Sequence, residues 1–303
     1  MTAAPMSDVM SDIPLHTLPV DAAAPIGIFD SGLGGLSVLR HIHAGMPQEH
    51  LLYFADSGYA PYGDKSDAAI VQRSLAVAGF LVEHGIKALV VACNTATAAA
   101  IQAIRSAWPT LVVVGIEPGL KPAAQLSNSK IIGVLATRST IASPRFQALR
   151  QQIEADGDIR FLTQACVGLA DQVEKAELSS VATAQLVDRY VRPLLAQGAD
   201  TLVLGCTHYP FVRALIESAA TDGPAPIIID TGEAVTRQLA RRLASTGLQR
   251  PAQLTGSLSA WTTGSAATLT HAFVNLLKLN PPVSAIATAP GNVNSSAAKE
   301  NQA

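Results

Sequence analysis

Short apolar runs alternate with longer segments of mixed polarity between residues 25 and 283. An uninterrupted apolar run of about four to eight residues is typical of a strand buried on both faces. Amphipathic stretches at 66–83 and 181–197 predict helices between such strands. This alternation predicts an α/β fold of mostly parallel sheets flanked by helices. The predicted strands are 26–29, 51–55, 88–92, 111–116, 131–136, 159–163, 201–205 and 226–230.

The chain also contains an internal echo. The segment GIKALVVACNTATAAAIQAI (85–104) aligns without gaps with GADTLVLGCTHYPFVRALI (198–216). In both, a Gly precedes a Cys by eight residues and an apolar run leads up to the Cys. Upstream, IGIFDS (26–31) echoes IGVLAT (132–137). The echo predicts two similar, pseudo-symmetric halves.

Composition narrows the class of protein. The chain has 303 residues, enough for two domains, and 49% of them are apolar. Its net charge is −2 and no Lys/Arg block stands out, which disfavours nucleic acid as a partner. No signal peptide and no apolar run of about 18 residues is present, so we expect no membrane partner. Residues 1–24 are expected to form a flexible extension, and residues 284–303 a disordered tail.

The three cysteines, Cys93, Cys166 and Cys206, are too few for a disulfide framework and lack C-x-x-C spacing. Neither a redox pair nor a metal site is therefore expected from local pattern. Free thiols indicate a reducing compartment, so a cytoplasmic location is expected.

Polar side chains follow several of the predicted strands. Ligands of open α/β sheets bind beyond the carboxyl ends of the strands, so these residues are candidates for a site. They are Asp30-Ser31, Asp56-Ser57, Cys93-Asn94-Thr95, Glu117, Thr137 and Cys206-Thr207-His208.

Cys93 and Cys206 end equivalent strands, each at an expected helix start, where backbone N–H groups favour a thiolate. Alone, each could be a small buried apolar residue, and Cys166 is interpreted in that way. Inversion of an amino-acid α-carbon needs one group on each face. A thiol whose pKa lies near 8.5, lowered somewhat by its surroundings, can act as acid or base there. Two equivalent thiols therefore favour a cofactor-independent amino-acid racemase.

Two neighbouring features leave alternatives open. In FDSGLGGLSVL, Ser37 stands where a dinucleotide fingerprint needs Gly, so the glycines are interpreted as a tight loop that lets backbone approach a small ligand. Asp30 is either a substrate or thiol contact or a helix cap. His208 could orient Cys206, or form with it the Cys/His pair of a thiol hydrolase, in which Cys93 would have no role. APYGDKS (60–66) is either a ligand-contacting loop or a surface turn.

Four segments, GIFDSGLGGLSVL, YFADSGYAPYGDKS, VVACNTATA and LVLGCTHYPF, resemble the glutamate racemases of the aspartate/glutamate racemase superfamily, across about residues 25–260. The resemblance implies two α/β domains, 25–116 with 229–283 and 117–228, with the active site between them. It implies interconversion of L- and D-glutamate without cofactor or metal, which supplies D-glutamate for cell-wall peptidoglycan and thus for cell shape. It also allows a homodimer.

The resemblance carries roles onto named residues. Cys93 and Cys206 are the catalytic pair, assisted by Asp30 and His208. A weaker match, CVGLADQVEKAEL (166–178), suggests Glu174 as a further carboxylate but departs from the family pattern at several positions. The matched substrate-binding residues are Asp30, Ser31, Tyr62, Gly63, Asn94, Thr95, Thr207 and His208.

Three rivals remain at this stage. An aspartate or hydantoin racemase of the same superfamily shares the two-thiol chemistry and differs in pocket shape. A non-catalytic binding protein on the same scaffold would not need both thiols. A thiol hydrolase would need Cys206 and His208 but not Cys93.

Overall fold

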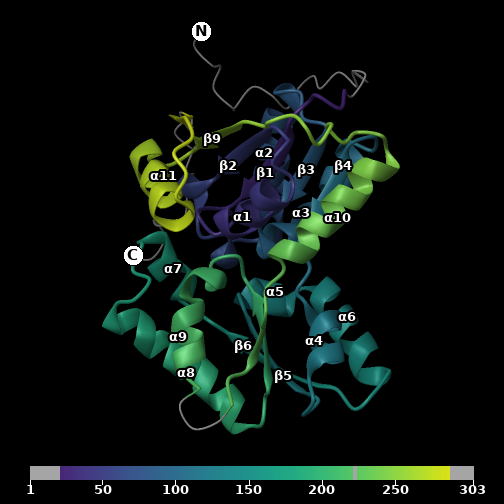
Figure 1. Ribbon diagram of the computed structural model, residues 1–303. Helices are drawn as coiled ribbons and strands as arrows, with labels where there is room; N and C mark the ends of the chain where they lie inside the picture. Colours follow the sequence, from purple (N-terminus) through teal and green to yellow (C-terminus); the bar gives the residue numbers. More distant parts are fainter. Residues whose placement is uncertain (1–20, 221–223, 287–303) are drawn as a thin grey trace, which may run out of the picture.

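The computed structural model describes residues 21–220 and 224–286, and it has two lobes (Figure 1). Each lobe is a sheet of parallel strands covered by helices, which confirms the predicted α/β class. Of the two predicted terminal segments, residues 1–20 and 287–303 lie outside the described residues.

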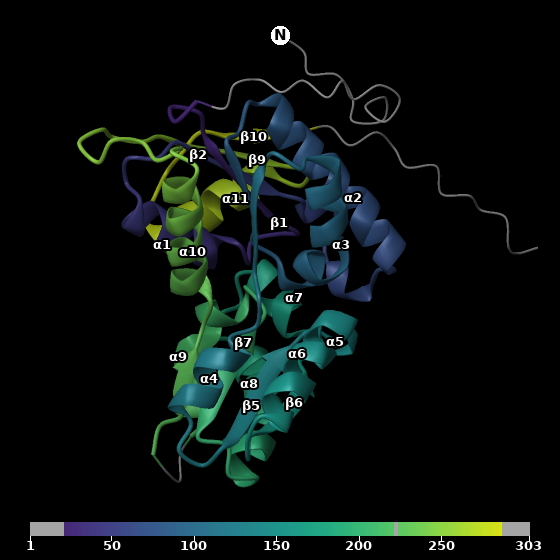
Figure 2. The same ribbon diagram turned by 90° about the vertical axis from the view of Figure 1, so that its right-hand side faces the viewer.

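The first lobe contains a sheet with the strand order β10–β9–β2–β1–β3–β4. Helices α1 (Leu36–Gly45), α10 (Gly232–Ser245) and α11 (Ala266–Ala272) cover one face. Helices α2 (Asp67–Glu83) and α3 (Asn94–Ala107) cover the other (Figure 2). The strands are β1 (Ile26–Asp30), β2 (Leu51–Ala55), β3 (Ala88–Val91), β4 (Val112–Gly115), β9 (Leu258–Thr262) and β10 (Val283–Ala285).

The second lobe contains a sheet with the strand order β6–β5–β7–β8. Its strands are β5 (Ile131–Ala136), β6 (Arg160–Ala165), β7 (Thr201–Gly205) and β8 (Ile227–Ile229). Helices α4 (Leu120–Leu126), α5 (Arg138–Ala142) and α6 (Pro144–Ala155) pack on one face. Helices α7 (Leu169–Glu174), α8 (Val181–Ala196) and α9 (Arg213–Ser218) lie on the other side.

The strands are apolar on both faces because helices cover both. In β1, Ile26 and Ile28 contact the cluster under α1 and α10, whereas Phe29 contacts the cluster under α2 and α3. All three side chains are fully buried. Continuous apolar runs therefore identified these strands, where a half-exposed sheet would have shown alternation.

The internal echo corresponds to a repeated topology. The order β2–β1–β3–β4 in the first sheet matches β6–β5–β7–β8 in the second. Ile28 pairs with Val90, and their counterparts in the echo, Val134 and Val203, also pair. Gly85 and Gly198 both have positive φ, of 73° and 90°, so both positions favour a residue without a Cβ.

Two strands and one boundary differ from the sequence analysis. β9 and β10 were not predicted, because their residues are largely half-buried or exposed near the sheet edge and their apolar runs are weak. Ser284 and Ala285 belong to β10, so the expected tail was placed too early.

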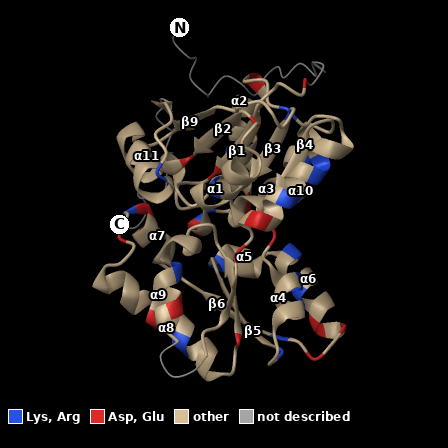
Figure 3. Cartoon of the chain, viewed as in Figure 1, with Lys and Arg blue, Asp and Glu red and all other residues tan. Residues whose placement is uncertain are grey.

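The surface of the described chain carries both signs of charge. Lys and Arg are interspersed with Asp and Glu over both lobes (Figure 3). Within residues 21–220 and 224–286, no helix combines the length and apolar content that a membrane span needs.

A buried ion pair lies at the amino ends of the first sheet, away from the carboxyl ends where ligands bind. Lys87, just before β3, and Glu49, just before β2, have fully buried side chains and contact each other. Lys87 also donates to the carbonyl of Ala22, and Glu49 accepts from the backbone N–H of Arg250 at 3.0 Å. Burial lowers the pKa of Lys87, but Glu49 opposes that shift. The pair joins four separate segments at this edge.

Replacing Lys87 with Met should lower the free energy of unfolding by about 3–5 kcal/mol, because Glu49 keeps its burial and loses its cation. Urea denaturation measures the change. The control is Arg213→Met, which breaks a half-exposed pair with Glu217 and should cost less than about 1 kcal/mol. Equal losses in the two variants would contradict an anchoring role for Lys87.

Candidate active site between the lobes

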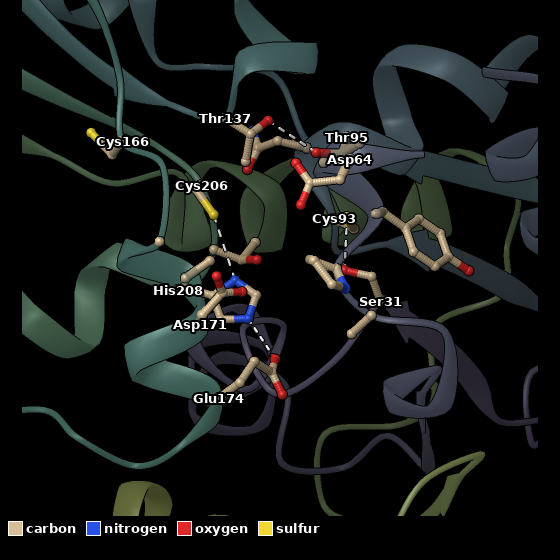
Figure 4. A pocket seen from close by; sticks show the side chains of 18 of the residues that line it. Ser31, Asp64, Cys93, Thr95, Thr137, Cys166, Asp171, Glu174, Cys206 and His208 are labelled. Carbon is tan, nitrogen blue, oxygen red and sulfur yellow. Dashed lines mark hydrogen bonds and ion pairs between the residues drawn. The ribbon is translucent and has the colours of Figure 1, made fainter. Parts of the chain in front are cut away.

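A cavity of about 620 Å³ lies where the carboxyl ends of both sheets meet (Figure 4). That volume is in the range usual for small-molecule sites. Its walls come from loops after β1, β2 and β3 in the first lobe and after β5, β6 and β7 in the second. The predicted site residues that line it are Ser31, Tyr62, Gly63, Cys93, Asn94, Thr95, Glu174, Cys206, Thr207 and His208.

Cys93 ends the β3 segment and is the N-cap residue of α3. Its sulfur accepts a hydrogen bond from the backbone N–H of Ala96 at 3.4 Å and contacts Oγ of Ser31 at 3.4 Å. Burial and the nearby charge of Asp30 outweigh these donors and raise the pKa of Cys93 to about 12. The expected lowering was therefore wrong for Cys93, and at neutral pH it is a protonated thiol.

Cys206 has a different environment, although it ends the equivalent strand. No α-helix starts there: a turn closed by Tyr209 N–H and Cys206 C=O leads into a 3₁₀ helix, Tyr209–Val212. The expected helix start at this cysteine was wrong for that reason. Its sulfur instead lies 3.5 Å from Nδ1 of His208.

His208 connects Cys206 to a carboxylate. Its Nε2 lies 2.6 Å from Oε1 of Glu174, which projects from α7. Burial favours neutral imidazole, but the sulfur of Cys206 and the carboxylate of Glu174 outweigh it and raise the pKa of His208 well above its usual value. The charged ring then donates from both nitrogens, and a cation at this distance stabilises negative charge on the sulfur.

Glu174, the weakest of the sequence candidates, is placed in the cavity wall. Burial would raise its pKa, but His208 and the backbone N–H of Leu33 hold that pKa below its usual value. Leu33 donates to Oε1 at 2.6 Å and belongs to the first lobe. The carboxylate is therefore charged and shared between the lobes.

Asp30 differs from the other candidates because it is fully buried and does not line the cavity. It accepts from the N–H of Gly32 at 2.9 Å, and Thr207 lies 3.4 Å away across the lobes. Burial raises the pKa of Asp30, although His208 opposes this. Its place behind the wall lets it act on the charge of Cys93.

The sequence suggested that the glycine loop after β1 lets backbone approach a small ligand. The structure shows that the loop instead packs against side chains of the second lobe. A Cβ at Gly32 would lie 2.1 Å from Oε1 of Glu174, and one at Gly34 would lie 2.5 Å from Nδ1 of His208. The glycines therefore make room for side chains of the second lobe.

The loop that carries Tyr62 and Gly63 is fixed from behind by Asp56. The hydroxyl of Tyr62 donates to this carboxylate at 2.6 Å, Arg73 donates to both of its oxygens, and Thr263 donates at 2.9 Å. Asp56 is fully buried, so it anchors the wall and does not face the cavity.

Thr137, one of the candidates that follow a predicted strand, also lines the cavity. Oγ1 of Thr137 lies 3.1 Å from Oγ1 of Thr95, so the two lobes meet at this wall (Figure 4). In the internal echo, Thr137 occupies the position equivalent to Ser31. Four lining residues that the sequence analysis did not single out add charge to the cavity: Asp64, Arg138, Asp171 and Lys175.

The arrangement places acid–base chemistry on two sides of one small space. The first lobe supplies a protonated thiol, and the second supplies a sulfur paired with an imidazolium. Among the described residues, nothing partners the buried amide nitrogen and oxygen of Asn94, which lines the cavity. Such unpaired polar atoms favour a polar ligand beside the thiols. In the described chain, no group of three or more His, Cys, Asp or Glu is arranged to hold a metal ion.

Known proteins resemble this chain over most of its length. The Asp/Glu/Hydantoin racemase family matches residues 26–239. A glutamate racemase from Methylococcus capsulatus is 52% identical over 242 residues, which cover 80% of this chain and 88% of that protein.

Solved structures show the same likeness. A Bacillus anthracis glutamate racemase isoform aligns with a TM-score of 0.79 at 31% identity, covering 87% of this chain and 97% of the other. The Escherichia coli glutamate racemase, in complex with L-glutamate and the activator UDP-MurNAc-Ala, aligns with a TM-score of 0.75 at 28% identity, covering 88% and 99%.

Replacing Glu174 with Gln should lower the pKa of His208, because the neutral amide no longer stabilises the imidazolium. An NMR titration of the ring measures the shift. The matched control is Glu217→Gln on exposed α9, which should leave that titration unchanged. An unchanged pKa in the Glu174 variant would show that Glu174 does not control the charge of His208.

Proposed function

The chain belongs to the Asp/Glu/Hydantoin racemase family, and we propose that it interconverts L- and D-glutamate by proton transfer between the α-carbon and two thiols, Cys93 and Cys206. One observation carries the mechanism: two cysteines at equivalent strand ends of two lobes line a single cavity. Removal of a proton from one face of the α-carbon and delivery of a proton to the opposite face need this placement.

In the proposed reaction the sulfur of Cys206, as thiolate, removes the α-hydrogen as a proton and leaves the electron pair on the α-carbon. The thiol of Cys93 then gives its proton to the opposite face, which inverts the centre and leaves Cys93 as thiolate. The protonation states of the two sulfurs have exchanged. The opposite enantiomer, or proton exchange with water, restores them.

The surroundings of each sulfur suit these starting roles. The high pKa of Cys93 keeps its proton in place until a carbanion is there to accept it. The imidazolium of His208, held by Glu174, stabilises a thiolate at Cys206. The family resemblance assigns removal of the L-glutamate hydrogen to Cys206 and of the D-glutamate hydrogen to Cys93.

Glutamate carries an ammonium and two carboxylates, and the cavity offers partners for each. Arg138 and Lys175 supply positive charge in the wall. The polar groups proposed to hold substrate are Ser31, Tyr62, Gly63, Asn94, Thr95, Thr137, Thr207 and His208, and Asp30 acts from behind Cys93.

The proposal has four wider parts. D-glutamate from this reaction supplies peptidoglycan synthesis, as the bacterial relatives suggest. The reaction needs both thiols reduced, which favours the cytoplasm, and a homodimer remains a prediction. The proposed first domain is residues 25–116 with 229–283, and the second is residues 117–228. The division of the strands between the two sheets supports these domains.

A racemase assay without added cofactor tests the proposal. Wild type should invert L-glutamate, and Cys93→Ser and Cys206→Ser should each lower turnover by about 10²–10⁴-fold, because a hydroxyl is a much weaker acid. Cys166→Ser is the control, because its thiol points away from Cys206 and it should keep most of the turnover (Figure 4). Inversion of L-aspartate but not L-glutamate would contradict the substrate assignment.

A thiol hydrolase is the second candidate, favoured by the chain of contacts from Cys206 through His208 to Glu174. In that case Cys93→Ser would keep activity towards an ester or amide substrate. The two-thiol mechanism predicts that this variant loses racemisation.

Deuterium incorporation in D₂O gives an independent check of the two-thiol mechanism. Each enantiomer should gain deuterium mainly in the inverted product, because the thiol that delivers the proton has exchanged with solvent. The α-hydrogen NMR signal of both enantiomers follows this. Early, equal deuterium uptake in recovered substrate and in product would indicate a single base.

A further inference from the structure

Ser37, in the first turn of α1, makes a contact between the lobes that the proposed reaction does not yet explain. Its hydroxyl donates to the backbone carbonyl of Thr207 at 2.8 Å. Ser37 belongs to the first lobe, and Thr207 stands between Cys206 and His208 in the second. Ser37 is 4% exposed and does not line the main cavity, so it is no substrate ligand.

The contact does not serve the helix itself. The N-cap residue of α1 is Gly35, which has no side-chain capping hydrogen bond, and Ser37 directs its hydroxyl away to the other lobe. The space that remains between α1 and the Cys206 loop is only about 10 Å³. Ser37 therefore meets Thr207 in a closely packed junction.

Neighbouring contacts reach the same assembly. The backbone N–H of Leu33 donates to Glu174, and Gly34 leaves room for His208 and Thr207. Residues 32–37 thus lie against Glu174, Thr207 and His208. Within residues 32–37, Ser37 is the residue whose side chain donates a hydrogen bond to the Cys206–His208 segment.

We propose that Ser37 is a positioning residue for Cys206, acting by fixing the Thr207 carbonyl and with it the relative placement of sulfur and imidazole. This rests on the proposed racemase function. Small displacements of reacting groups are costly, since a misplacement of about 1 Å can slow a reaction about 10²-fold. The first lobe therefore completes the acid–base group of the second.

The described hydrogen bonds of the Cys93 sulfur do not cross between the lobes. Its sulfur contacts Ser31 and Ala96, which belong to its own lobe. Loss of the Ser37 hydroxyl should therefore impair proton transfer at Cys206 and leave transfer at Cys93 nearly unchanged. This asymmetry separates positioning from general loss of structure.

The test compares Ser37→Ala with Ser74→Ala. Ser74 is also a buried helical serine, in α2, and its hydroxyl has no partner among the described residues. Ser37→Ala should lower kcat/KM by about tenfold, because the Thr207 carbonyl is left without its donor. The fall must be equal in both directions, since the enantiomers have equal free energy in water. Ser74→Ala should leave kcat/KM unchanged.

The discriminating measurement is the kinetic isotope effect with α-deuterated L- and D-glutamate. In Ser37→Ala, it should increase for the enantiomer whose hydrogen Cys206 removes, because that step becomes more rate-limiting. It should decrease for the other enantiomer, for which proton delivery from Cys206 becomes limiting. A smaller active fraction would lower the rates and leave both isotope effects at their wild-type values, which would overturn the proposal.

A second readout does not depend on racemisation. The ring NMR signals of His208 should move in Ser37→Ala and stay in place in Ser74→Ala. If wild type does not invert glutamate, the proposed function fails, and the His208 signals still decide whether Ser37 positions this assembly. Unchanged signals in Ser37→Ala would overturn the positioning role.

Discussion

The buried imidazolium of His208 is the constraint on which the site depends. A charge that is removed from water needs hydrogen-bonding partners of opposite charge, because without them the stability of the fold falls by several kcal/mol. Here Cys206 and Glu174 take the two ring nitrogens, and Glu174 in turn takes an N–H from Leu33 of the first lobe. The group of contacts that balances this buried cation therefore extends into the first lobe through Leu33.

The repeated topology explains why there are two thiols, and local contacts explain why they differ. Cys93 follows β3, which pairs with β1, and Cys206 follows β7, which pairs with β5. Both cysteines therefore face the space between the lobes. Cys93 is the N-cap residue of a long helix beside a buried carboxylate, whereas Cys206 precedes a turn and pairs with His208. A symmetric scaffold thus gives its two thiols different surroundings.

In the first sheet, the amino ends of the strands carry contacts that stabilise the fold, and the carboxyl ends carry the residues of the candidate site. At the amino ends, Lys87 and Glu49 form a buried pair that does not line the cavity between the lobes, and this pair joins separate segments. At the carboxyl ends, Asp56 anchors the Tyr62 loop, and the glycine loop accepts side chains from the second lobe. Parallel strands place all their carboxyl ends together, so polar residues after them meet at one edge.

The sequence alone determined the strands whose apolar runs are buried on both faces, the equivalence of Cys93 and Cys206, and the polar residues that follow strands at the cavity wall. Those features are local, since they follow from run length, from the echo and from polar residues directly after strands. Tertiary structure decided the protonation of Cys93, because burial and Asp30 raise its pKa where a helix start alone predicts the opposite. It also decided the roles of Glu174, Thr137 and Ser37, whose partners lie far away in the chain: the contact from Ser37 to Thr207 spans 170 residues. No local pattern encodes such a contact, since it forms only when two separately folded sheets are packed against each other.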